Sequence, residues 1–257
     1  MTGLEAPTHI YLSPHLDDAV LSCGGRIWTQ SQADERVVVI TIFGGTRRPD
    51  ASLSWFARQL EARWGQEEST ERRRAEDFRA LALLGAEAVH WPYLDCIYRS
   101  APDGRIPYAD EATLWGEIDP SDAAIVSEVA DRIDRLVTAP GGECYVPIAI
   151  GRHIDHRIVR KAAEGSRHPL VYYEDFPYAR DPQAVRAALE HHHWEPELIP
   201  LSEEALQAKA AAIACYASQI STFWTSPEEM AASVHAFAEQ TGSGVPAERY
   251  WRRDRKP

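Results

Sequence analysis

Short apolar runs alternate with longer segments of helical periodicity along most of the chain. Five of these runs predict β-strands, at residues 10–13, 37–43, 88–91, 144–148 and 170–173. The second run, VVVITIF, is almost entirely β-branched, which is typical of a central parallel strand buried on both faces. The segment 194–201, WEPELIPL, is also expected to be extended.

Helical patterns fill the intervals between these runs. The first helix is expected to begin at Asp17 or Asp18 and to end near Gln32, and the next to cover residues 54–84 with a break near Gly65. Further helices are predicted over residues 120–138, 154–164, 182–191 and 202–218. Alternating strands and helices indicate an α/β fold. We predict one domain over residues 1–257, a Rossmann-like, mainly parallel sheet flanked by helices on both faces.

Composition narrows the classes of partner. The chain has 27 Lys and Arg residues against 39 Asp and Glu, a formal net charge of -12. Nucleic-acid binding needs a basic face, so we expect no nucleic-acid partner. No apolar window is long enough for a membrane span, and the N-terminus lacks the pattern of a signal peptide, so we expect a cytoplasmic protein. The four scattered cysteines predict free thiols, and the sequence leaves open whether the protein forms a homo-oligomer.

Two clusters of acids and histidines follow predicted strands. SPHLDDA, residues 13–19, comes after the first strand, and GRHIDHR, residues 151–157, comes after the fourth. Ligands of open parallel sheets bind beyond the carboxyl ends of the strands, so both clusters should lie on one rim. His15, Asp18 and His156 would hold a divalent cation and leave a position for water, as in catalytic zinc sites.

The remaining members of the two clusters suit the other steps of a metal-assisted hydrolysis. Asp17 can act as a general base on the water. His153 and Asp155 can orient imidazoles and support developing negative charge. Each cluster also has a simpler interpretation, because adjacent aspartates often cap a helix and HxDH is often a surface turn. Finding both clusters on one rim favours the chemical interpretation.

Some neighbouring side chains are candidates for substrate contacts. Glu174 and Asp175 follow the last predicted parallel strand and are expected either to bind sugar hydroxyls or to serve as turn carboxylates. At least one tryptophan is a candidate for stacking on a sugar, from the set Trp55, Trp64, Trp91 and Trp115.

The two motifs together resemble the PIG-L/LmbE-like family of metal-dependent N-deacetylases, in which a strand is followed by PHxDD and later by HxDH. RRAEDFRALALLGAEAVHWPYLD, residues 73–95, is similar to a further block of that family, as are residues 171–179 and 209–220. The chain departs from the common family pattern at Leu16, where proline is frequent, and at Ala19, where glutamate is common. Neither position is an inferred metal ligand.

The resemblance implies an LmbE-like fold and a role for each motif residue. The implied metal ligands are His15, Asp18 and His156, with zinc as the metal and Fe²⁺ or another divalent ion as an alternative. The implied catalytic residues are the general base Asp17, the oxyanion-stabilising His153, and Asp155, which tunes His153. Arg73 and Asp95 are implied near the substrate. A tyrosine is also implied near the oxyanion, with Tyr145, Tyr173 and Tyr178 as candidates.

The resemblance implies a hydrolase that removes an N-acyl group, with acetyl as the expected group, from an amino sugar or a glycosylated small molecule. PHLDD is similar to the form found in proteins encoded with bacterial secondary metabolism. Two alternatives stay open. One is an amidase that acts on a larger conjugate, such as a sugar-thiol adduct or a natural product. The other is a non-catalytic sugar-binding protein of the same fold.

Overall fold

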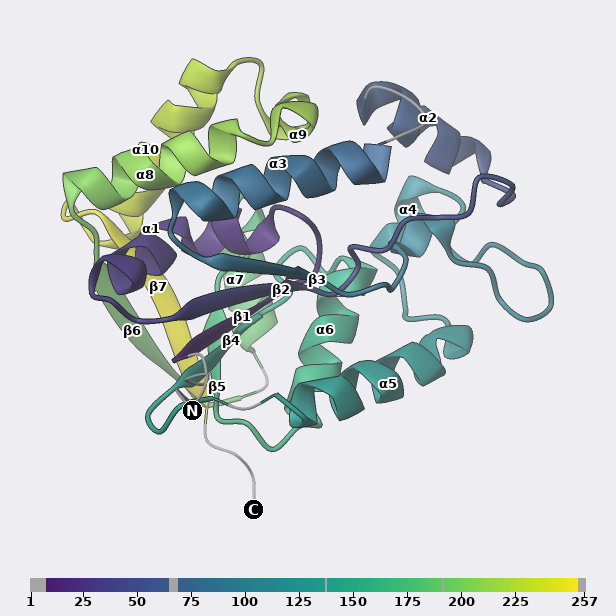
Figure 1. Ribbon diagram of the computed structural model, residues 1–257, viewed down its shortest axis with the longest axis horizontal. Helices are drawn as coiled ribbons and strands as arrows, with labels where there is room; N and C mark the ends of the chain where they lie inside the picture. The colour runs from purple at the N-terminus through teal and green to yellow at the C-terminus, as the bar shows by residue number, and fades with distance from the viewer. Residues whose placement is uncertain (1–7, 65–68, 137, 191, 254–257) are drawn as a thin grey trace, which may run out of the picture.

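A seven-stranded sheet forms the centre of the molecule in the computed structural model, which describes residues 8–64, 69–136, 138–190 and 192–253 (Figure 1). The strand order is β3-β2-β1-β4-β5-β7-β6. Strands β1 to β5 are parallel to one another, whereas β7 is antiparallel to both β5 and β6. The bounds are β1 His9–Ser13, β2 Val37–Thr41, β3 Glu87–His90, β4 Glu143–Pro147, β5 Leu170–Tyr173, β6 Trp194–Pro200 and β7 Ala247–Arg253.

Helices cover both faces of this sheet. Figure 1 shows α1, α3, α8 and α10 against one face and α5 and α6 against the other. The α-helices are α1 Asp18–Gln32, α2 Trp55–Trp64, α3 Ser69–Leu83, α4 Glu111–Leu114, α5 Ala123–Asp134, α6 Ile154–Glu164, α7 Pro182–Leu189, α8 Glu203–Ala214, α9 Ala217–Phe223 and α10 Pro227–Thr241. Three 3-10 turns are η1 Cys96–Tyr98, η2 Pro120–Asp122 and η3 Tyr178–Arg180.

The predicted α/β class, the five parallel strands and the extended segment after residue 193 are confirmed, with end shifts of one or two residues. The helix predicted over residues 54–84 is two helices, and residues 65–68 lie outside the described part of the chain, as does His191. The helix predicted over 120–138 begins as a 3-10 turn and ends at Asp134. The helix predicted over 202–218 is interrupted between α8 and α9, at Cys215 and Tyr216. No prediction covered α10 or β7.

Side chains of the central strands enter two separate cores. From β1, Ile10 and Leu12 pack with the core that includes Ile133 of α5 and Ile158 of α6. Tyr11 points to the opposite core, which α1, α3 and α8 cover. Every residue of β1 and β2 is buried, as the β-branched run predicts for strands covered on both faces.

Helix α1 lies unusually close to its neighbours because of two adjacent glycines. A Cβ atom on Gly25 would lie 2.7 Å from the Leu201 Cδ1 atom, and one on Gly24 would lie 2.9 Å from the Lys209 Cγ atom. Glycine in a helix interior costs about 1 kcal/mol relative to alanine, and close packing offsets that cost here. Because α1 starts directly after the His15–Asp18 loop, this packing also fixes where the loop lies.

Two further predictions concern the whole chain. No helix in the described ranges is long and apolar enough to cross a membrane. Cys23, Cys96 and Cys144 are buried and Cys215 is half-buried, and all four are free thiols, as predicted.

We expect Gly25→Val to destabilise the protein by about 1–3 kcal/mol, because the new side chain must displace Leu201 in a packed interior. Thr29→Val, on the exposed side of the same helix, is the matched control and should change stability by less than about 0.5 kcal/mol. Urea unfolding followed by circular dichroism measures both. Equal stability of the two variants would show that α1 has room to move.

Candidate active site

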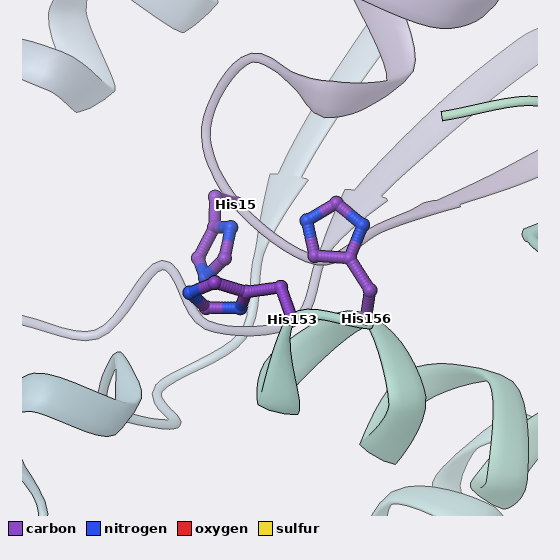
Figure 2. A group of neighbouring side chains, drawn as sticks. All are labelled: His15, His153 and His156. Carbon is purple, nitrogen blue, oxygen red and sulfur yellow. The ribbon is translucent and has the colours of Figure 1, made fainter. Parts of the chain in front are cut away.

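The two motifs meet at the carboxyl ends of neighbouring strands. His15 and Asp18 lie in the loop after β1, and His153 and His156 lie at the start of α6, after β4. Because β1 pairs directly with β4, the two loops are adjacent. Figure 2 shows the three imidazole rings grouped together, with His15 on the loop before α1 and the other two on α6. The predicted convergence on one rim is confirmed.

One oxygen atom of Asp18 lies at the centre of this group. Its Oδ2 atom is 3.1 Å from the His15 Nδ1 atom and 3.3 Å from the His156 Nε2 atom. It also accepts a 2.8 Å hydrogen bond from the backbone N–H of His15. The Asp18 side chain is therefore directed at the two imidazoles.

Two buried carboxylates hold the far nitrogen atoms of these imidazoles. The His15 Nε2 atom lies 3.0 Å from the Asp155 Oδ2 atom, and the His156 Nδ1 atom lies 2.7 Å from the Asp175 Oδ1 atom. Each carboxylate accepts an N–H of its imidazole, so the other ring nitrogen faces Asp18, and in a neutral ring that nitrogen carries the lone pair. Three acceptor atoms thus point at one another, and only a cation or shared protons make such an arrangement favourable.

The pKa values of His15, His156 and Asp18 show that the space between these side chains favours positive charge. Burial acts to lower the pKa of His156, but Asp18 and Asp175 raise it to about 10. Burial likewise opposes the charged form of His15, and its hydrogen bonds to Asp155 and Asp18 raise its pKa well above the usual value. Burial would raise the pKa of Asp18, yet the two imidazoles bring it well below its usual value.

The donor atoms present are ones that divalent metals accept. In a tetrahedral zinc site with bonds of 2.0–2.2 Å, ligand atoms are about 3.3 Å apart, close to the separations around Asp18. His15, His153 and His156 also form a group whose ligand atoms lie within 4.8 Å of one another. Two overlapping groups of the same kind are Cys96, His153, Asp155 and His15, Asp95, Asp155. The described residues can therefore hold a divalent metal.

Asp17 lies beside this centre without serving as a helix cap. It occupies the N-cap position of α1, but its side chain makes no capping hydrogen bond. Instead its Oδ1 atom lies 3.7 Å from a terminal nitrogen of Arg73. Burial raises the pKa of Asp17 to about 6, with Arg73 opposing the shift and Asp18 reinforcing it. The carboxylate is free to exchange a proton near neutral pH.

His153 has a different hydrogen-bonding pattern from the other two histidines. Its Nδ1 atom accepts the backbone N–H of Asp155 at 3.3 Å and so caps α6. Burial and the nearby His15 lower the pKa of His153 to about 3. The neutral ring therefore carries its proton on Nε2 and can donate it in a hydrogen bond.

A cleft of about 230 Å³ opens onto these groups. Arg73 and Asp95, which are expected to contact the substrate, line this cleft. The Arg73 guanidinium also lies 5.0 Å from the Trp64 ring centre, and Asp95 lies 3.8 Å from the His15 Nε2 atom. The apolar lining consists of Leu21, Phe56, Leu60, Trp64, Ile97, Leu114, Trp115, Pro177 and Phe223.

The aromatic candidates separate clearly by position. Of the three tyrosines, Tyr178 lines the cleft, whereas the Tyr173 hydroxyl donates to the Leu12 carbonyl oxygen inside the core. The Tyr145 hydroxyl donates to Glu143 at the opposite end of β4. Trp64 and Trp115 line the cleft, whereas Trp91 is buried in the core and Trp55 is 69% exposed.

Glu174 and Asp175 do not lie where sugar binding would need them, because neither is among the described residues that line the cleft. Glu174 pairs with Arg249 and accepts the Trp251 indole N–H. Asp175 accepts the Ile150 N–H at 2.8 Å as well as the His156 ring. Its support of His156 was missed, since no motif marks a carboxylate that acts on another loop.

The sequence and fold match known proteins closely. A family model described as GlcNAc-PI de-N-acetylase (PIG-L) matches residues 10–165, more than half of the chain. The chain belongs to this family. Both motifs, and all residues from the second residue of β1 to the end of α6, fall inside the matched residues.

Two relatives of this chain are 2'-N-acetylparomamine deacetylases. The Niallia circulans enzyme is 30% identical over 186 residues, which cover 66% of each chain. The Streptomyces fradiae enzyme is 31% identical over 183 residues, 68% of this chain but only 59% of that enzyme. A crystal structure of the zinc-inhibited form of a teicoplanin deacetylase is similar with a TM-score of 0.83 and 30% identity. It covers 96% of this chain and 99% of that one.

We expect Asp175→Asn to weaken divalent-metal binding by about 10- to 100-fold, because the amide cannot hold the His156 tautomer as the carboxylate does. Glu174→Gln is the matched control: it changes the neighbouring residue, whose partners are Arg249 and Trp251. Titration of metal-free protein with Zn²⁺ against a chromophoric chelator measures both. Equal Zn²⁺ affinities of the two variants would show that Asp175 does not support metal binding.

Proposed function

We propose that the protein is a zinc-dependent N-deacetylase that acts on an amino sugar of a glycosylated small molecule. The observation that carries the proposal is the convergence of three acceptor atoms, from His15, Asp18 and His156, beside a buried carboxylate with a raised pKa. Membership of the de-N-acetylase family and the relatives that deacetylate paromamine and teicoplanin derivatives support the same reaction class.

We assign the metal to His15, Asp18 and His156 rather than to the group that contains His153. Both nitrogen atoms of His153 are committed, because Nδ1 accepts a backbone N–H and Nε2 carries the proton. Cys96 is also a poor ligand here, since burial keeps its pKa well above the usual value and the thiol protonated. Asp155 is engaged by His15 and by the Arg99 guanidinium.

The chemistry that a divalent cation supplies when bound at such a site is polarisation of the amide carbonyl and a lower pKa for water. Asp17 accepts the proton of the attacking water, for which a pKa of about 6 is well matched to neutral pH. The His153 Nε2–H donates to the oxygen that becomes negatively charged. Asp17 then delivers its proton to the amine as the C–N bond breaks, which leaves a free carboxylate and the amino sugar.

The walls of the cleft indicate what surrounds the sugar. A cleft of about 230 Å³ accommodates roughly one monosaccharide unit with its acyl group, so the rest of a larger substrate must lie at the entrance. Phe56 and Leu60 from α2, Leu114 from α4 and Phe223 from α9 make much of the lining apolar. We infer that the sugar carries an apolar or aromatic group.

Asp17→Asn should lower kcat by about 10²- to 10⁴-fold, because the amide cannot accept the proton of the attacking water. Zinc content should remain that of the natural protein, since Asp17 is not an assigned ligand. His15→Ala is the contrasting variant and should lose both zinc and activity. Full activity of Asp17→Asn would refute the mechanism. Release of a larger carboxylic acid in place of acetate from the preferred substrate would favour the alternative function, an amidase that acts on a larger conjugate.

Phe56→Ser should raise KM for p-nitrophenyl N-acetylglucosaminide about tenfold and leave KM for the methyl glycoside unchanged. The reason is that burial of an aromatic side chain against the aryl group contributes about 1.5–3 kcal/mol. Trp55→Ser alters the adjacent, exposed residue of α2 and serves as the control. Equal KM values for the two glycosides in the natural protein would contradict an apolar subsite.

A further inference from the structure

A buried arginine outside both motifs connects the candidate metal centre to the wall of the cleft. Arg99 follows η1 and is only 6% exposed. One terminal nitrogen, Nη2, lies 2.7 Å from the Asp155 Oδ1 atom and 3.1 Å from the Asp122 Oδ2 atom. The other, Nη1, donates to the Leu94 carbonyl oxygen at 3.1 Å. The cation is thus held between two carboxylates that lie far apart in the sequence.

The surroundings of Arg99 fix its plane as well as its charge. The guanidinium carbon lies 4.9 Å from the Phe43 ring centre and 5.4 Å from that of Tyr108. Rings on a planar cation restrict its rotation, and a lysine ammonium would not be held in the same way. The position therefore favours arginine over any other cation.

Asp155 transmits this position to His15. The carboxylate is fully buried, and its Oδ2 atom accepts the Cys96 N–H at 2.9 Å and contacts the His15 ring at 3.0 Å. Its Oδ1 atom faces Arg99. Without Arg99, the ion pairs of Asp155 within the described part of the chain would be reduced to the one with His15, which is strongly unfavourable for a buried carboxylate. The carboxylate would then be drawn away from its present position, and His15 would lose its acceptor.

The other carboxylate, Asp122, anchors the segment that forms the cleft wall. It accepts the Tyr108 hydroxyl at 2.7 Å, and that hydroxyl accepts the Asp119 N–H at 2.9 Å. Helix α4, which carries Leu114 of the lining, lies between Tyr108 and Asp119. The Arg99 guanidinium therefore fixes both the cleft wall, through Asp122, and His15, through Asp155.

We propose that Arg99 is a positioning residue that holds His15 in its metal-binding orientation through Asp155. The proposal rests on the function proposed above, in which His15 is a metal ligand. It predicts that Arg99 influences metal affinity only by way of Asp155. A merely structural arginine would lower stability without that dependence.

A double-mutant cycle tests this directly. Arg99→Gln and Asp155→Asn should each raise the Zn²⁺ dissociation constant of the metal-free protein by about 10- to 100-fold. The double variant should bind zinc within about twofold of Asp155→Asn alone, because the second change removes nothing that still acts on His15. Losses that multiply in the double variant would overturn the proposal.

Lys209→Gln is the control for the loss of a buried ion pair. Lys209 is buried on α8 and contacts Glu248 at 2.7 Å, so its replacement should lower Tm and leave zinc affinity unchanged.

If Arg99→Gln does not fold, Arg99→Lys takes its place in the cycle, with a smaller loss of zinc affinity expected. Natural protein that binds no zinc would refute the proposed function and this inference together. Zinc affinity unaltered in a folded Arg99 variant would refute this inference alone.

Discussion

The organisation of the site depends on one juxtaposition, in which an oxygen of Asp18 faces the ring nitrogens of two buried imidazoles and only positive charge between them makes the arrangement favourable. Asp155 and Asp175 enforce it, because each holds the N–H of one ring and leaves the other nitrogen directed at Asp18. Both carboxylates are almost completely buried, so their own charges depend on further partners. The backbone N–H of Ile150 supports Asp175, and Arg99 supports Asp155. This chain of constraints fixes the directions of the three atoms that we propose as metal ligands.

The sheet order explains how residues far apart in the sequence are brought together here. Strands β1, β4 and β5 are neighbours, and they are parallel, so the loops that follow them open on the same side. The first loop carries His15 and Asp18, the second leads to His156, and the third carries Asp175. In open parallel sheets this edge is where ligands bind. The antiparallel pair β6 and β7 lies beyond β5 and extends the sheet without contributing a residue to the lining of the cleft.

The parts of the molecule that were predictable from sequence are those with a local signal. β-branched runs identified the parallel strands, and two motifs identified the rim and its principal side chains. Asp175 and Arg99 carry no such signal, because their charged partners lie 19 or more residues away and their roles exist only after folding. Strand β7 was missed for a related reason. Its sequence, AERYWRR, looks exposed, yet Glu248 is buried because Lys209 and two backbone N–H groups satisfy its charge.

Asp17 and Asp18 show most clearly why residue type alone does not determine a role. They are adjacent and chemically identical, and both are buried. Asp18 faces two imidazoles, which lower its pKa well below the usual value and keep it an anion. Arg73, at 3.7 Å, opposes burial at Asp17 less effectively, so burial prevails and the pKa of Asp17 rises to about 6. Paired acids whose surroundings separate their pKa values can divide the work of charge stabilisation and proton transfer. The direction in which each side chain leaves the start of α1 therefore decides which carboxylate faces the imidazoles and which one is suited to proton transfer.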